Sequence, residues 1–114
     1  MCTYNCKGHG DDRIEYLKSL MNICDIIFIQ EHWLFHSEIC ILAQKIGNVN
    51  VFGVSPMDNK SLLVGRPHGG CAIMYSKSMS TPVTQIETDN PRICAGILKV
   101  SNSCSILLIC VYMP

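Results

Sequence analysis

The chain has 114 residues, with nine Lys and Arg against nine Asp and Glu, so its formal net charge is zero. This is the length of one globular domain or less, and a 48% hydrophobic content with 16% charged residues excludes the composition of intrinsic disorder. Because the charges balance, any contact with a polyanion must be local.

Neither a membrane span nor a secretory signal is visible. The longest apolar run, from Ile106 to Met113, is far shorter than the roughly 18–20 residues of a membrane helix. The start, MCTYNCKGHGDD, lacks a basic segment followed by an apolar one. We therefore expect an intracellular protein, nuclear or cytoplasmic, that is not secreted and has no membrane partner.

The first thirty residues predict a strand, a helix and a second strand. Residues 1–6 favour a short strand, and 11–22 carry apolar residues at helical spacing. Asp12 and Glu15 resemble the capping pair that begins a helix. The apolar run over 25–30 is short and bounded by polar residues, which is typical of a strand buried on both faces.

The remaining chain predicts one more helix and then strands only. The helix is expected over 37–46 and ends before Gly47. A polar, glycine-bearing loop is expected over 57–70, and a tight turn over 101–103. The period-two apolar pattern predicts strands over 49–56, 71–77, 82–88, 92–100 and 104–113.

Two of these strands, 25–30 and 104–113, are apolar on both faces and need cover on two sides. Two helices cover only one face of a sheet, so we expect the other face to lack a partner within these residues. An uncovered apolar face is an interface or an aggregation liability. The sequence therefore predicts possible self-association through this face.

The eight cysteines could form disulfides or bind zinc instead of remaining reduced thiols. A disulfide scaffold is typical of secreted chains, and zinc sites need paired spacings that these cysteines lack. His32 and His36 are four apart on a possible helix, but without the H-E-x-x-H order. We expect free thiols, with five in or beside apolar runs as small buried hydrophobes: Cys24, Cys40, Cys71, Cys94 and Cys110.

Polar side chains end the first two predicted strands. A strand, crossover helix and parallel strand place both strand ends on the same edge of a sheet. Asn5 ends the first strand and Glu31 the second, so an amide and a carboxylate would meet there and suit a hard divalent cation. The alternative is a solvated Glu31 and an Asn5 in a turn.

Four segments together resemble a known family. In order and spacing they are similar to the endonuclease/exonuclease/phosphatase family, above all to the apurinic-type endonuclease domain of LINE-like, non-LTR retrotransposons. The resemblance implies a deoxyribonuclease-like, four-layer α/β sandwich. Residues 1–114 look like its N-terminal half, a mixed sheet with two helices on one face. The segments are YNCKG (4–8), DIIFIQEHW (25–33), GRPHGGCAI (65–73) and VYMP (111–114).

The resemblance also implies a Mg²⁺-dependent DNA endonuclease and a role for individual residues. Glu31 would bind Mg²⁺, Asn5 would orient the metal or the scissile phosphate, and Tyr112 would lie beside that phosphate. The alternative for Tyr112 is a ring that closes the core at a strand end. Lys7 and Arg66 could contact DNA phosphates, or could simply be solvated.

Other residues near these motifs have structural interpretations. Gly69 and Gly70 are expected to allow close backbone packing at the start of a core strand. Trp33 is expected to pack in the core or in a lid. Neither His32 nor His68 matches the catalytic histidine of the family.

The family's later G-D-x-N and S-D-H motifs do not occur in this chain. They would supply the group that activates water and the histidine that binds phosphate, and a general base alone contributes roughly 10²–10⁴ in rate. We therefore expect a truncated domain that binds Mg²⁺ weakly and is inactive by itself. The alternative is a non-enzymatic interaction module, a domesticated half-domain that binds a partner through its uncovered sheet face.

Overall fold

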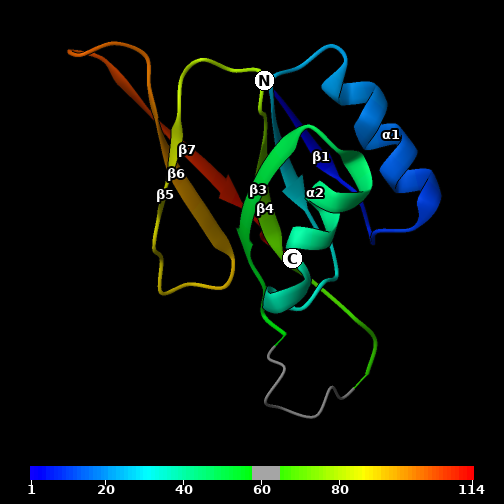
Figure 1. The fold of residues 1–114 in the computed structure, drawn as a ribbon. Helices are drawn as coiled ribbons and strands as arrows, with labels where there is room; N and C mark the ends of the chain where they lie inside the picture. Colours follow the sequence, from blue (N-terminus) through cyan, green and yellow to red (C-terminus); the bar gives the residue numbers. More distant parts are fainter. Residues whose placement is uncertain (58–64) are drawn as a thin grey trace.

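The computed structural model describes residues 1–57 and 65–114, which form a layer of helices and two packed β-sheets (Figure 1). The fold is a mixed α/β fold, as predicted. One sheet has four strands in the order β1-β2-β4-β3, and the other has three in the order β5-β6-β7. The four-stranded sheet lies between the helices and the three-stranded sheet.

The four-stranded sheet is mixed. β1 and β2 are parallel and place Asn5 opposite Gln30, whereas β4 is antiparallel to both β2 and β3. The central strands are short apolar runs with buried residues on both faces, as expected for 25–30; the strand predicted over 71–77 has the same burial. The strands are β1 (Cys2–Asn5), β2 (Ile26–Gln30), β3 (Val49–Val54) and β4 (Cys71–Ser76).

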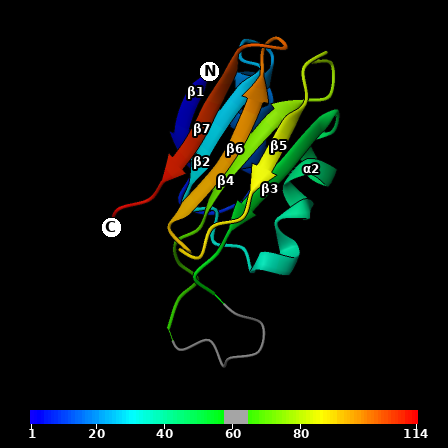
Figure 2. The ribbon, with the colours of Figure 1, turned by 90° about the vertical axis from the view of Figure 1, so that its left-hand side faces the viewer.

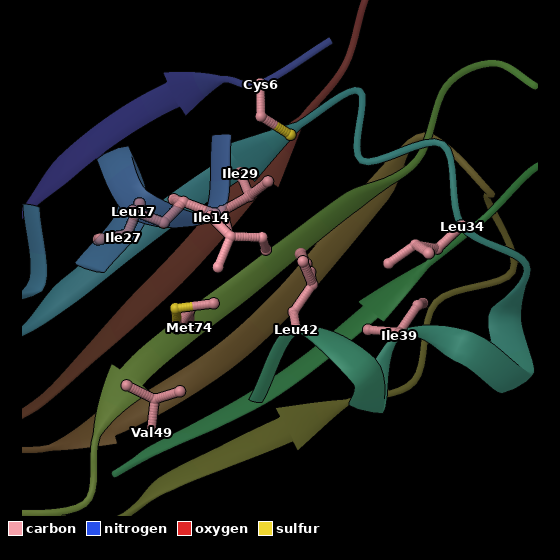
Figure 3. Close-up of a cluster of buried hydrophobic side chains, with 11 residues drawn as sticks. Cys6, Ile14, Leu17, Ile27, Ile29, Leu34, Ile39, Leu42, Val49 and Met74 are labelled. Atoms are coloured by element: carbon pink, nitrogen blue, oxygen red, sulfur yellow. The ribbon is translucent and has the colours of Figure 1, made fainter. Parts of the chain in front are cut away.

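Both helices cover one face of this sheet, as predicted. α1 (Asp11–Met21) is the crossover between β1 and β2, and α2 (Cys40–Ile46) precedes β3. Their apolar sides bury a core against the sheet (Figure 3). Its members come from both helices, from β2, β3 and β4 and from adjoining loops, and include Leu17, Ile27, Ile29, Leu42 and Met74.

The helix starts differ from the sequence prediction. α1 begins after Gly10 without any side-chain cap, so the proposed Asp12–Glu15 capping pair is wrong; Asp12 instead forms an ion pair with Arg13. A 3₁₀ turn over His36–Glu38 precedes α2 because the Glu38 carboxylate accepts the Phe35 N–H at 3.1 Å. The α-helix is therefore shorter than the predicted 37–46.

The second sheet packs on the other face of the first. Its strands are β5 (Val83–Ile86), β6 (Ile93–Lys99) and β7 (Ser105–Val111), joined as antiparallel neighbours. Ile26 and Ile73 from the first sheet meet Cys94, Leu108 and Cys110 from the second in a separate buried cluster. Each of these strands is shorter than its predicted run, since the ends continue into turns.

The sequence predicts the uncovered face on the sheet that the two helices cover. It lies instead on the second sheet. Residues 83–111 pair with each other as consecutive antiparallel strands and fold over the first sheet, so the first sheet has cover on both faces. Figure 2 looks onto the open outer face of β5, β6 and β7. Exposed apolar side chains gather there: Ile97 (39% exposed), Leu107 (58%), Ile109 (50%) and Val111 (44%).

All eight cysteines are free thiols in the structure. Cys71, Cys94 and Cys110 are buried between the sheets, where burial raises the pKa of Cys94 to about 12. Cys40 is exposed, which contradicts the expectation that it is buried. It lies on the outer side of α2, where its thiol donates a hydrogen bond to the Ser37 carbonyl. No helix among the described residues is long and apolar enough to span a membrane.

Candidate functional site

Asn5 and Glu31 meet at the carboxyl ends of the two parallel strands. β1 ends at Asn5, β2 ends one residue before Glu31, and the register sets Asn5 beside Gln30. The Asn5 side-chain amide donates to Oε1 of Glu31 at 2.8 Å. The predicted contact between the amide and the carboxylate is therefore present, and it fixes the orientation of the carboxylate.

Tyr112 reaches the same carboxylate from the second sheet. It follows β7 directly, and its N–H donates to the Arg92 carbonyl at 3.0 Å, which continues the β6–β7 ladder by one residue. Desolvation and the nearby negative charge of Glu31 raise the pKa of the Tyr112 hydroxyl. Two residues from opposite ends of the sequence thus lie at Glu31: Asn5 is hydrogen-bonded to its carboxylate, and Tyr112 shares a cavity wall with it.

A cavity of about 570 Å³ opens beside Glu31 and Tyr112, and Trp33 and Arg66 are also in its wall. A neighbouring cavity of about 320 Å³ includes Lys7 in its wall. Arg66 is therefore placed at the Glu31 cavity, whereas Lys7 is placed at the adjacent one.

The chain between β2 and the 3₁₀ turn has an unusual backbone. Glu31 and Trp33 have φ values of +56° and +59°, in the left-handed region that costs non-glycine residues roughly 1–2 kcal/mol each. Hydrogen bonds hold this conformation: the Glu31 N–H donates to the Gly70 carbonyl at 2.8 Å, and the Trp33 N–H to the Gly69 carbonyl at 3.1 Å. The backbone conformation at Glu31 is therefore held by hydrogen bonds to the residues that precede β4.

His32, between these two residues, is completely buried. Its Nε2–H donates to the Val54 carbonyl at 3.1 Å, and its Nδ1 accepts the Leu34 N–H at 3.0 Å. Both partners suit the neutral ring. Burial, with smaller contributions from His9 and His36, lowers the pKa of His32 to about 4, although the Val54 carbonyl opposes the shift. His32 is thus a neutral anchor for the turn that presents Glu31.

The predicted close approach at the glycine pair is present. A Cβ on Gly70 would lie 2.3 Å from Cε1 of His32, and a Cβ on Gly69 would lie 2.7 Å from the Pro56 ring. Residues 31–35 are not helical, so the considered i, i+4 arrangement of His32 and His36 on one helix face is wrong. The hydrogen bonds of His32 within the turn are the reason.

The structure corrects the expectation for Trp33 and adds His68 to the site. Trp33 is half-buried and lies in the walls of both cavities, so it is not a core residue. The sequence indicates no role for His68, but it lines the Glu31 cavity. Its Nδ1 forms a hydrogen bond with the Arg66 carbonyl in the same loop, at 3.1 Å. Residues 58–64 of the predicted 57–70 loop lie outside the described residues.

The donor set at Glu31 is small. Within residues 1–57 and 65–114, no group of three or more His, Cys, Asp or Glu side chains is arranged to hold a metal ion. Mg²⁺, however, keeps several waters and often takes one or two carboxylates with substrate phosphates. One oriented carboxylate beside an amide fits such an ion, with weak affinity in the absence of substrate.

No protein-family model matches the chain, and no curated protein matches it significantly. The chemistry available at the site is therefore inferred from its residues: an oriented carboxylate, a phenol, an exposed cation and an indole around one cavity.

Proposed function

We propose that the chain carries the metal-binding side of a Mg²⁺-dependent phosphodiesterase site for DNA, of the kind found in retrotransposon endonucleases. The observation that supports this most is the Glu31 carboxylate, which the Asn5 amide orients and which shares the wall of an open cavity with Tyr112. We also propose an intracellular site of action, nuclear or cytoplasmic.

The proposal extends to the fold. Helices, one sheet and a second sheet form three layers in order, and the second sheet has an open apolar face. We propose that these layers correspond to part of a four-layer, deoxyribonuclease-like sandwich. The open face is then where a fourth layer packs in such a sandwich.

Each residue has a chemical role under this proposal. Glu31 binds Mg²⁺ through a carboxylate that Asn5 holds in place, and the bound ion would neutralise charge on a substrate phosphate. Tyr112 lies in the cavity wall beside the position of the phosphate, and Arg66 supplies a positive charge there. Lys7 offers a second contact for a DNA phosphate at the adjacent cavity.

We propose that this chain alone does not cut DNA. Among the described residues that line the Glu31 cavity, no second carboxylate is present. His68 forms a hydrogen bond with the Arg66 carbonyl of its own exposed loop, and no hydrogen bond among the described residues joins it to Glu31. Among the residues that the structure describes, the cavity thus has no positioned general base. Nicking of supercoiled plasmid by the pure chain with Mg²⁺, above the level of a Glu31→Gln control, would contradict this.

The metal role of Glu31 predicts the outcome of a Mg²⁺ titration by calorimetry. We expect weak binding that Glu31→Gln reduces at least about tenfold, because the amide removes the charged oxygen ligand. Glu15→Gln is the matched control, since Glu15 lies exposed on α1 and pairs with Lys18. Equal loss in both variants, or no loss in Glu31→Gln, would remove Glu31 as the ligand.

A second candidate, a non-enzymatic module that self-associates, is favoured by the open face of β6 and β7. Leu107 lies opposite Ile97 in the register, and both are exposed. We expect concentration-dependent association in sedimentation velocity that Leu107→Lys suppresses and Ile23→Lys does not, because Ile23 is 79% exposed but lies beyond α1. A wild-type chain that stays monomeric would argue against this candidate.

A further inference from the structure

Trp33 stands between the two cavities of the site. It is the only tryptophan of the chain, and with Pro67 it lies in the wall of both the Glu31 cavity and the Lys7 cavity. Its side chain is half-buried, not part of either core cluster. Part of the indole is therefore accessible in the same cavity wall as the Glu31 carboxylate.

The position of the Trp33 backbone and ring is fixed by its surroundings. The residue has a φ of +59°, and its N–H donates to the Gly69 carbonyl. Gly8 packs so closely that a Cβ there would lie 3.1 Å from Cε3 of the indole. The chain thus adopts a strained conformation that keeps this ring at the surface, and strain of this kind is concentrated at functional sites. A ring held in place before binding loses little entropy on contact with a ligand.

Each of the two cavities that Trp33 lines also has a positively charged residue in its wall. Arg66 is in the wall of one cavity and Lys7 is in the wall of the other. Both are exposed, and neither takes part in the two ion pairs found among the described residues. An aromatic face with flanking cations matches a nucleic-acid strand, whose bases stack on aromatic rings while its phosphates contact cations.

We propose that Trp33 is a stacking platform for one unpaired base of the DNA strand whose phosphate faces Glu31. This inference rests on the proposed function and names its substrate class. A base in a regular duplex is already stacked on its neighbours, whereas a single-stranded or displaced base is free to stack on the indole. The site therefore prefers DNA with an unpaired base over an intact duplex.

The test uses the whole chain and three labelled probes without Mg²⁺: an oligothymidine, an oligonucleotide of equal length made only of abasic sites, and a duplex. Binding is measured by anisotropy and by the fluorescence of Trp33. Stacking on an aromatic side chain contributes about 1–3 kcal/mol per base. We expect fluorescence quenching by oligothymidine, and about tenfold weaker binding of it by Trp33→Ala, with little change for the abasic probe and partial recovery in Trp33→Phe.

Lys7→Ala serves as the contrasting variant, because loss of a phosphate contact weakens both single-stranded probes alike. The inference is overturned if Trp33→Ala weakens both probes equally, if binding leaves the Trp33 fluorescence unchanged, or if oligothymidine does not bind. In each of these cases the Glu31-dependent Mg²⁺ titration still decides separately whether the proposed metal site exists.

Discussion

Gly70→Ala is expected to lower the free energy of unfolding by about 3 kcal/mol or more, since an added Cβ meets a ring that cannot move. The Cβ would lie 2.3 to 2.8 Å from three atoms of His32, which is buried and held by two hydrogen bonds. Gly70 also has a φ of +91°, which disfavours alanine by itself. Urea unfolding of both proteins measures the difference.

Gly65→Ala separates the clash from the backbone effect. Gly65 has a similar φ of +94°, but nothing lies within 4 Å of an added Cβ. We expect its substitution to cost only about 1 kcal/mol, from the backbone conformation alone. If the two variants lose equal stability, the contact of Gly70 with His32 is not what constrains this position.

The stability of the fold is expected to fall by about 3 kcal/mol as the pH decreases from about 6.5 to about 4. The pKa of His32 is about 4 in the folded chain, against 6.5 for a free histidine. The unfolded chain therefore binds more protons in this range, and acid favours unfolding. Above pH 6.5 the ring is neutral in both states, so this contribution is fully present there.

Urea unfolding at a series of pH values measures this slope. Protonation also converts Nδ1 of His32 from the acceptor of the Leu34 N–H into a donor, so the turn that presents Glu31 and Trp33 loses a hydrogen bond. His68→Gln is the control, because it removes an exposed histidine and leaves His32 in place. If the pH dependence disappears in His68→Gln, the titrating ring is His68 and the prediction for His32 is wrong.

The central features of the fold follow from local sequence patterns. An apolar run bounded by polar residues locates β2, a period-two pattern locates β4, and helical spacing locates α1. The right-handed crossover brings Asn5 to Glu31. The meeting of these two side chains is predictable because it needs only neighbouring elements of the chain.

Features that depend on distant contacts were not predictable. The strands over 83–111 have the same period-two pattern whether they extend the first sheet or form a second one, so the open face was placed on the wrong sheet. The role of His32 depends on the Val54 carbonyl and on Gly70, both far along the chain. In the sequence, only the adjacent Gly69 and Gly70 pointed to this contact. They predicted close packing but did not identify His32 as the partner.

The most direct test of the proposed metal site is a map of Mn²⁺-induced line broadening in the amide NMR spectrum, with Mn²⁺ replacing Mg²⁺ at oxygen ligands. The account predicts that the amide signals of Asn5, Glu31 and Tyr112 broaden first, and that Glu31→Gln removes this pattern while Glu15→Gln keeps it. Broadening centred elsewhere, or an unchanged pattern in Glu31→Gln, would contradict a metal site at Glu31.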